Sequence, residues 1–123
     1  MARTLMAAAT AIGLALAAAA PAPAADLEFF TGDSLSAQCS AKPGDADFGA
    51  KQGRCVGYVV GVSDAQQAGQ GLGATPRVCF PASVTATQMV AAVSAFLGAH
   101  PEKRPLAAQD LVVEALSAQY PCK

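Results

Sequence analysis

Cysteine is the residue type with the clearest chemistry in this chain, and its four copies are Cys39, Cys55, Cys79 and Cys122. A catalytic cysteine needs a base to form its thiolate, and the chain has one histidine, His100. No two cysteines have the C-x-x-C spacing of redox proteins, and cysteine and histidine lack the spacings typical of zinc sites. The first 25 residues have the pattern of an export signal, and an even number of cysteines in an exported protein indicates disulfides. We therefore expect two disulfides, no catalytic residue, no metal and no cofactor.

The other reactive side chains do not form a catalytic set either. Ser63 and Ser94 have no histidine placed to activate them, and no pair of residues is arranged for general acid–base catalysis. His100 follows Phe96 by four residues, so it can shield that ring or contact the carbonyls at a helix end. Asp64 lies in an apolar segment and is either a helix-surface residue or an internal hydrogen-bond anchor. The chain is not expected to be an enzyme.

The first 25 residues have the pattern of a secretory signal peptide. Arg3 supplies the positive start, residues 5–20 form an apolar run that is mostly alanine, and small residues allow cleavage near Ala22 to Ala25. The run is shorter than the roughly 18 apolar residues of a membrane span, so a retained anchor is the less favoured alternative. The mature chain would be residues 26–123, a single domain with no membrane segment, in an oxidising compartment.

The overall charge argues against some classes of partner. Eight basic and nine acidic side chains give a formal net charge of −1. This balance does not indicate nucleic acid or an anionic membrane as a partner. A single domain of about 100 residues buries a limited share of its surface, so disulfides would supplement its stability.

The first expected elements are a short helix and a polar loop. The helix would run from Leu35 to Ser40, because Thr31 can cap it and because Leu35 and Cys39 fall on one face. Residues 41–47 collect Pro, Gly and Asp, which is typical of an exposed loop.

Residues 55–68 are apolar enough for a buried strand or a buried helix. Their β-branched side chains favour a strand, whereas their length and the shared helical face of Tyr58, Val62 and Ala65 favour a helix. We interpret them as a helix that needs tertiary packing, since each internal glycine costs about 1 kcal/mol. The Gly-x-Gly-x-Gly string at 69–73 then ends this helix. It is not a nucleotide motif, because no strand precedes it and no helix opens directly after it.

Two more helices complete the expected fold. Thr85 and Gln88 form a capping box that starts a helix, and this helix stops before Pro101. The last helix would have Pro105 in its first turn and end before Tyr120. The sequence therefore predicts an all-α fold, a small disulfide-stapled helical bundle of about four helices.

Four short patterns follow one another in a fixed order along the chain: C-x-G-Y, C-x-P, H-P-E and a terminal P-C. They stand here as Cys55-Val56-Gly57-Tyr58, Cys79-Phe80-Pro81, His100-Pro101-Glu102 and Pro121-Cys122, with Thr31-Gly32-Asp33 ahead of them. This ordered set resembles the Rap/Tai family of immunity proteins against type VI secretion amidase effectors. The resemblance covers nearly the whole chain after the signal.

The resemblance implies a mostly helical periplasmic protein, often a homodimer, with no activity of its own. Such proteins block a peptidoglycan-cleaving amidase by occupying its active-site cleft, so the expected partner is an amidase effector. The alternative is a periplasmic stress protein or acid chaperone, whose clustered carboxylates would be Asp26, Glu28, Asp33, Asp45 and Asp47. An envelope protein that uses the same fold for another partner also stays open.

Two loops are candidates for contact with the partner, residues 42–52 and residues 69–78. We prefer the second, because Arg77 stands next to a disulfide anchor and an anchored loop loses less freedom on binding. The candidate contact residues are Gln70, Leu72, Thr75, Arg77, Asp45 and Asp47, and the expected structural residues are Tyr58, Asp64, Thr85, Gln88 and Pro101.

Four cysteines allow three pairings, and the order of the helices ranks them. If the last two helices run antiparallel, as their short connection implies, Cys79 and Cys122 lie at the same end of the bundle. That leaves Cys39 to pair with Cys55.

Overall fold

The computed structural model describes residues 30–123, which fold into four α-helices without a sheet. The elements are α1 (Gly32–Cys39), α2 (Phe48–Gly71), α3 (Ala86–Ala99), the 3₁₀ turn η1 (Pro101–Lys103) and α4 (Ala108–Gln119). The predicted all-α fold of about four helices is therefore confirmed. The predicted signal peptide lies outside the described residues.

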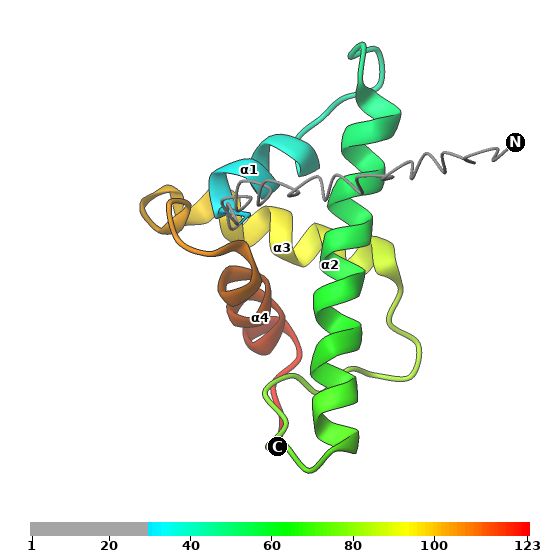
Figure 1. Ribbon diagram of the computed structural model, residues 1–123, viewed down its shortest axis with the longest axis vertical. Helices are drawn as coiled ribbons and strands as arrows, with labels where there is room; N and C mark the ends of the chain where they lie inside the picture. Colours follow the sequence, from blue (N-terminus) through cyan, green and yellow to red (C-terminus); the bar gives the residue numbers. More distant parts are fainter. Residues whose placement is uncertain (1–29) are drawn as a thin grey trace, which may run out of the picture.

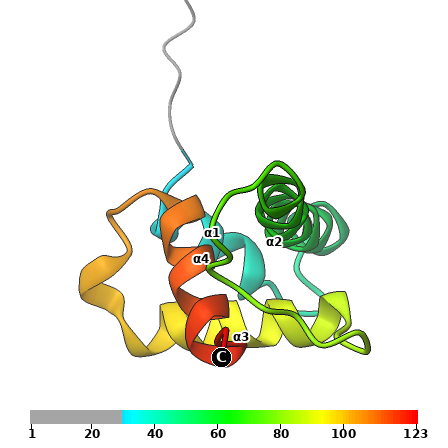
Figure 2. The ribbon, with the colours of Figure 1, turned by 90° about the horizontal axis from the view of Figure 1, so that it is seen from below.

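The longest helix, α2, spans the height of the molecule in Figure 1. Its 24 residues correspond to about 36 Å at 1.5 Å per residue. It packs against each of the other three helices, and Figure 2 views it along its axis beside them. The predicted helix over residues 55–68 is confirmed, but α2 already begins at Phe48. Residues 48–52, expected within a candidate loop, are therefore helical, because the Lys51 N–H already donates to the Asp47 carbonyl at 2.9 Å.

Side chains from all four helices and from the segment after α2 form one apolar core. The largest of its fully buried residues are Leu35, Leu97, Leu111, Leu116, Val59, Val78, Val93 and Val112. Burying a side chain of this size contributes roughly 1.5–3 kcal/mol, so this core supplies the main drive to fold. Helices α3 and α4 provide most of the core residues.

Both predicted N-caps are present. Thr31 Oγ1 accepts a hydrogen bond from the Ser34 N–H at 3.3 Å, and α1 begins directly after Thr31. Thr85 Oγ1 accepts from the Gln88 N–H at 3.3 Å, while Gln88 Oε1 accepts from the Thr85 N–H at 2.9 Å. The predicted capping box is therefore confirmed.

The last helix starts later than predicted, at Ala108. Pro105 and Leu106 lie in the turn between η1 and α4, where the Leu106 carbonyl accepts a hydrogen bond from the Gly32 N–H at 3.0 Å. A Cβ on Gly32 would lie 2.8 Å from the Arg104 carbonyl oxygen, so this close approach requires glycine. The prediction of a helical Pro105 is wrong, because this turn pairs with the start of α1 instead.

Figures 1 and 2 show α4 crossing α3 steeply rather than running antiparallel to it. The antiparallel expectation is wrong, since η1 and the turn after it redirect the chain before α4 begins. Disulfides nevertheless join Cys39 to Cys55 and Cys79 to Cys122, which is the pairing preferred from the sequence. The first ties the end of α1 to α2, and the second ties the segment after α2 to the C-terminus.

Candidate partner-binding site

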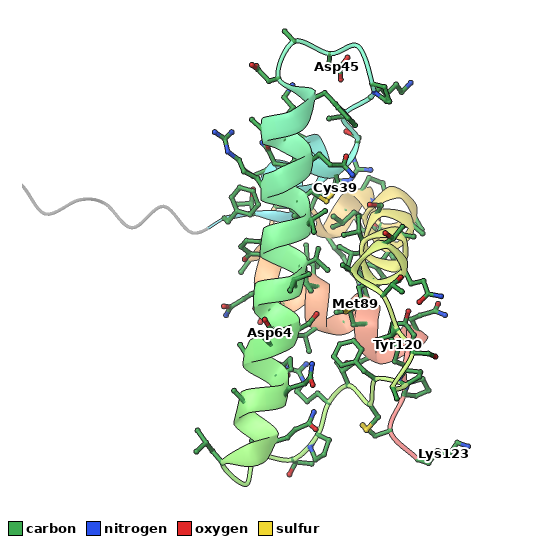
Figure 3. All side chains as sticks on the ribbon, turned by 90° about the vertical axis from the view of Figure 1, so that its right-hand side faces the viewer. Cys39, Asp45, Asp64, Met89, Tyr120 and Lys123 are labelled. Carbon is green, nitrogen blue, oxygen red and sulfur yellow. A yellow bond between two sulfur atoms is a disulfide. The ribbon has the colours of Figure 1, made fainter. Side chains whose placement is uncertain are left out.

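The two candidate loops lie at opposite ends of α2, so the fold does not bring them together (Figure 1). We call residues 40–47 the Asp45 loop and residues 69–78 the Leu72 loop. Figure 3 places Asp45 at one end of the molecule and Tyr120 toward the other. The predicted contact residues therefore belong to two separate surfaces.

The Asp45 loop is closed by hydrogen bonds within itself. The Lys42 N–H donates to Asp45 Oδ2 at 2.9 Å, and the Asp45 N–H donates to the Lys42 carbonyl at 3.0 Å. Gly44 has φ +104°, a conformation that favours glycine. Asp47 is the N-cap of α2, but its side chain makes no capping hydrogen bond. Asp45 and Asp47 are exposed, and the surface of this loop is polar.

The Leu72 loop presents an apolar side chain to solvent. Leu72 is 89% exposed, more than the other exposed large apolar residue of the described chain, Leu106 at 55%. Gly73 has φ +91°, and its N–H donates to the Gln70 carbonyl at 3.0 Å. Thr75 and Arg77 are exposed farther along the loop. This loop therefore joins an apolar tip to a cationic side chain.

The base of the Leu72 loop is fixed at several points. Gln70 Nε2 donates to the Val78 carbonyl at 3.1 Å, and the Val78 side chain is fully buried in the core. The Cys79 N–H donates to the Tyr120 carbonyl at 3.0 Å beside the Cys79–Cys122 disulfide. Gln70 is a predicted contact residue, but its side-chain amide is engaged in a hydrogen bond within the loop. These contacts anchor both ends of the loop to the rest of the fold.

A pocket of about 210 Å³ opens beside the Leu72 loop, between α2 and α4. Arg77 lines it from the loop, Asp110 from α4 and Gln66 from α2, and the buried Val113 also contributes. Neither Arg77 nor Asp110 forms an ion pair within residues 30–123. Asp110 is not among the contact residues predicted from the sequence. In the sequence, Asp110 falls on the polar side of an amphipathic helix. Many solvated charged residues share such a position, so it does not mark Asp110 as a site residue.

A larger hollow of about 480 Å³ lies between the start of α3 and the end of α4. Pro81 and Tyr120, which flank the Cys79–Cys122 disulfide, line it together with three alanines of α3. Among residues 30–123, no charged side chain lines this hollow. It combines apolar surface with uncharged polar side chains.

Tyr58 lies on α2 and packs against the residue before Thr31. Its ring packs on Phe30 with the centroids 4.9 Å apart. Burial raises the pKa of the Tyr58 hydroxyl, a hydrogen bond from the Gln109 backbone acts in the opposite direction, and the charge of Asp110 adds to the increase. Tyr58 thus connects α2 to the first turn of α4, at the edge of the pocket.

Asp64 is exposed on α2, which corresponds to the helix-surface alternative (Figure 3). The buried polar residue is its neighbour Ser63, whose hydroxyl donates to the Val59 carbonyl at 2.8 Å. One residue of difference changes the face of a helix by about 100°, and the sequence left this choice open. Pro101 is the first residue of η1, and α3 ends just before it at Ala99.

His100 and the four cysteines are engaged in contacts within the fold. The His100 ring stacks on Phe96 with the centroids 4.5 Å apart, and its Nδ1 lies 3.1 Å from Glu102 Oε1. A hydrogen bond from its own backbone N–H, followed by the contact with His100, lowers the pKa of the exposed Glu102 carboxyl. All four cysteines are in disulfides, and within residues 30–123 no group of acidic, histidine or cysteine residues could hold a metal ion.

A family model of the Rap1a immunity proteins matches residues 31–122. The chain belongs to this family. The match includes all four helices and both disulfides, and it confirms the resemblance seen in the sequence. No curated protein and no solved structure matches the chain significantly. As a Rap1a immunity protein, the chain is expected to bind a cognate effector. None of the helices in residues 30–123 is long and apolar enough to cross a membrane.

Proposed function

We propose that this protein is an exported immunity protein that binds and blocks a peptidoglycan amidase effector of a type VI secretion system. Membership of the Rap1a family supports the immunity role. Cleavage of residues 1–25 as a signal peptide would place residues 26–123 in the periplasm, where such an effector meets peptidoglycan. The blockade needs no catalytic group in this chain, because an occupied cleft already excludes the substrate.

The Leu72 loop is the segment that we propose to enter the cleft of the amidase, and its exposed leucine is the observation that carries this proposal. Burying a side chain of this size on binding would contribute roughly 1.5–3 kcal/mol. Gln70, Val78 and Cys79 already fix the base of the loop, so little freedom is lost when the partner binds. The Asp45 loop lacks such an apolar tip.

The acid-chaperone alternative has no arrangement in residues 30–123 that favours it. Asp33 lies in the first turn of α1, and Asp45 and Asp47 lie in the loop before α2. All three are exposed, and none belongs to an ion pair within this part of the chain. Asp26 and Glu28 lie outside the described residues. These separate, exposed carboxylates give no support to a chaperone function.

Capture of the partner is the first test. Oxidised residues 26–123 would serve as bait in a periplasmic extract from the organism that encodes the chain. We expect an amidase to be captured, and we expect its hydrolysis of purified peptidoglycan to stop when the bait is added. Recovery of no amidase, or of an amidase that the bait does not inhibit, would contradict the proposed function.

Two matched leucine variants then test the loop. Leu72→Asp is expected to weaken inhibition at least about tenfold, because it places a charge where an apolar contact is buried. Leu106→Asp is the control, since Leu106 is also an exposed large apolar residue but lies in the turn before α4. Both variants should keep the thermal unfolding midpoint nearly unchanged. Inhibition by Leu72→Asp at the level of the wild type would remove the loop from the mechanism and leave the immunity role standing.

The family resemblance also implies a homodimer, which we keep as part of the proposal. Light scattering of the mature protein should then give about twice the mass of one chain. A monomer at the concentrations used for inhibition would remove the dimer and leave the blockade of the amidase untouched.

A further inference from the structure

The pocket between α2 and α4 carries two opposite charges that do not neutralise each other. Arg77 and Asp110 both line this space of about 210 Å³. Within residues 30–123, the ion pairs that form involve other residues. Both side chains are exposed, so each charged group is available to a ligand. A ligand that suits the pocket would bring a negative group to Arg77 and a positive group to Asp110.

This pocket is the charged half of a longer groove. A second hollow of about 320 Å³ continues along α2 past Tyr58 and Gly61, and the two hollows share Val62, Ala65 and Gln109. A free amino acid would fill only the charged half. A polypeptide segment can occupy both halves, with its charged side chains at one end and an apolar stretch at the other. The shape of the groove therefore favours a segment of a protein.

The apolar half of the groove exposes the backbone of α2. A Cβ added at Gly57 or Gly61 would meet no atom within 4 Å, so the packing of this chain does not require glycine at either position. Glycine lowers the stability of a helix interior relative to alanine. The two residues nevertheless leave room for another backbone to approach the helix closely.

We propose that this groove binds a mixed-charge segment of the amidase effector. The segment places a carboxylate on Arg77 and a basic side chain on Asp110, and its apolar part lies over Gly57 and Gly61. This inference rests on the proposed function and adds a second contact surface beside the Leu72 loop, which itself carries Arg77. The planar guanidinium of arginine orients a carboxylate through two parallel hydrogen bonds. The opposite charges of Arg77 and Asp110 set the register in which the segment binds. They disfavour an effector whose segment carries its charges in another order, so the groove selects the cognate effector.

Charge variants test this recognition with the captured amidase as the probe. Arg77→Asp and Asp110→Arg are each expected to weaken binding at least about tenfold, and the loss should shrink in high salt. The double variant exchanges the two charges and keeps the net charge, yet it should bind no better than the single variants. Arg54→Asp is the control, because Arg54 is an exposed basic residue of α2 outside the groove. Asp110→Asn serves as a milder variant if Asp110→Arg unfolds the start of α4.

A pair of glycine variants tests the apolar half independently. Gly61→Leu should weaken binding at least about tenfold, because the new side chain occupies the groove. Gly49→Leu is the control, since it is equally open but lies 12 residues away along α2, about 18 Å. Both variants should fold, because a leucine favours a helix at either position.

Three results would overturn the inference. One is binding at the wild-type level by every groove variant. Another is recovery of binding in the charge-exchanged double variant. That result would mean that Arg77 and Asp110 interact with each other rather than with the effector. The third is loss of a dimer with unchanged affinity for the amidase, which would assign the groove to a second copy of the chain. The proposed function fails in a different way, when the wild type itself neither captures nor inhibits an amidase.

Discussion

The two ends of α2 share the same kinds of stabilising features but expose different surfaces. Each end has a disulfide, a glycine with positive φ and a side chain that closes the loop onto its backbone. At the Asp45 end, Cys55 is only 1% exposed and the loop is polar. At the Leu72 end, both cysteines are exposed and the loop holds a leucine in solvent.

The two ends of α2 use similar local features in two different ways. At the Asp45 end, these features mark the start of α2 and join this helix to α1. At the Leu72 end, they hold an apolar side chain away from the core, which is unfavourable for the isolated protein but suits a contact with a partner. We therefore expect both ends to affect folding, and we expect the Leu72 end alone to affect inhibition of the amidase.

Removal of the disulfides should have the largest effect. The Cys79–Cys122 bond spans a sequence separation of 43 and the Cys39–Cys55 bond one of 16. On the chain-entropy model, replacing each pair by alanine lowers the free energy of unfolding by about 4 and about 3 kcal/mol, respectively. Urea unfolding measures both losses. Inhibition should weaken for the Cys79/Cys122 variant alone, because it frees the base of the Leu72 loop, and equal weakening in both variants would contradict the division between the ends.

Several local features of the fold could be predicted from the sequence because they depend on residues that are close together in the chain. The capping box of Thr85 and Gln88 depends on residues three apart, so its outcome needs no tertiary information. The end of α2 near the glycines at 69–73 and the candidate loop after it follow from composition in the same way. Arg77 is a predicted contact residue in that loop because it stands close to Cys79, which anchors the loop through its disulfide.

The missed features depend on contacts between distant residues. Gly49 and Gly53 make the start of α2 a poor helix by propensity, and the sequence gives no sign that it is helical from Phe48. Pro105 has the right chemistry for a first helical turn, but its segment pairs with the start of α1. Asp110 shares a pocket with Arg77 only because α4 lies beside the end of α2, which no spacing in the sequence reveals.

The two glycines with positive φ provide a test of intermediate size. Gly44→Ala and Gly73→Ala should each lower the free energy of unfolding by about 1 kcal/mol, because a Cβ is disfavoured in the left-handed region. Thermal or urea unfolding should show similar losses for the two variants. Gly73→Ala should also weaken inhibition, since relief of the strain moves the tip that carries Leu72. A weaker inhibition by Gly44→Ala would place the Asp45 loop in the interface.

The smallest expected effect comes from the side chains that close the two loops. Asp45→Ala removes the acceptor of the Lys42 N–H, and Gln70→Ala removes the donor to the Val78 carbonyl. Each loss should lower the free energy of unfolding by about 0.5–1 kcal/mol, because these hydrogen bonds are exposed or half-buried. Gln70→Ala should in addition slow the association with the amidase, since a looser loop must be ordered when it binds. If Gln70→Ala and Asp45→Ala associate with the amidase at the same rate, the Gln70–Val78 bond serves the fold alone, and Leu72 acts through its exposure rather than through a preset position.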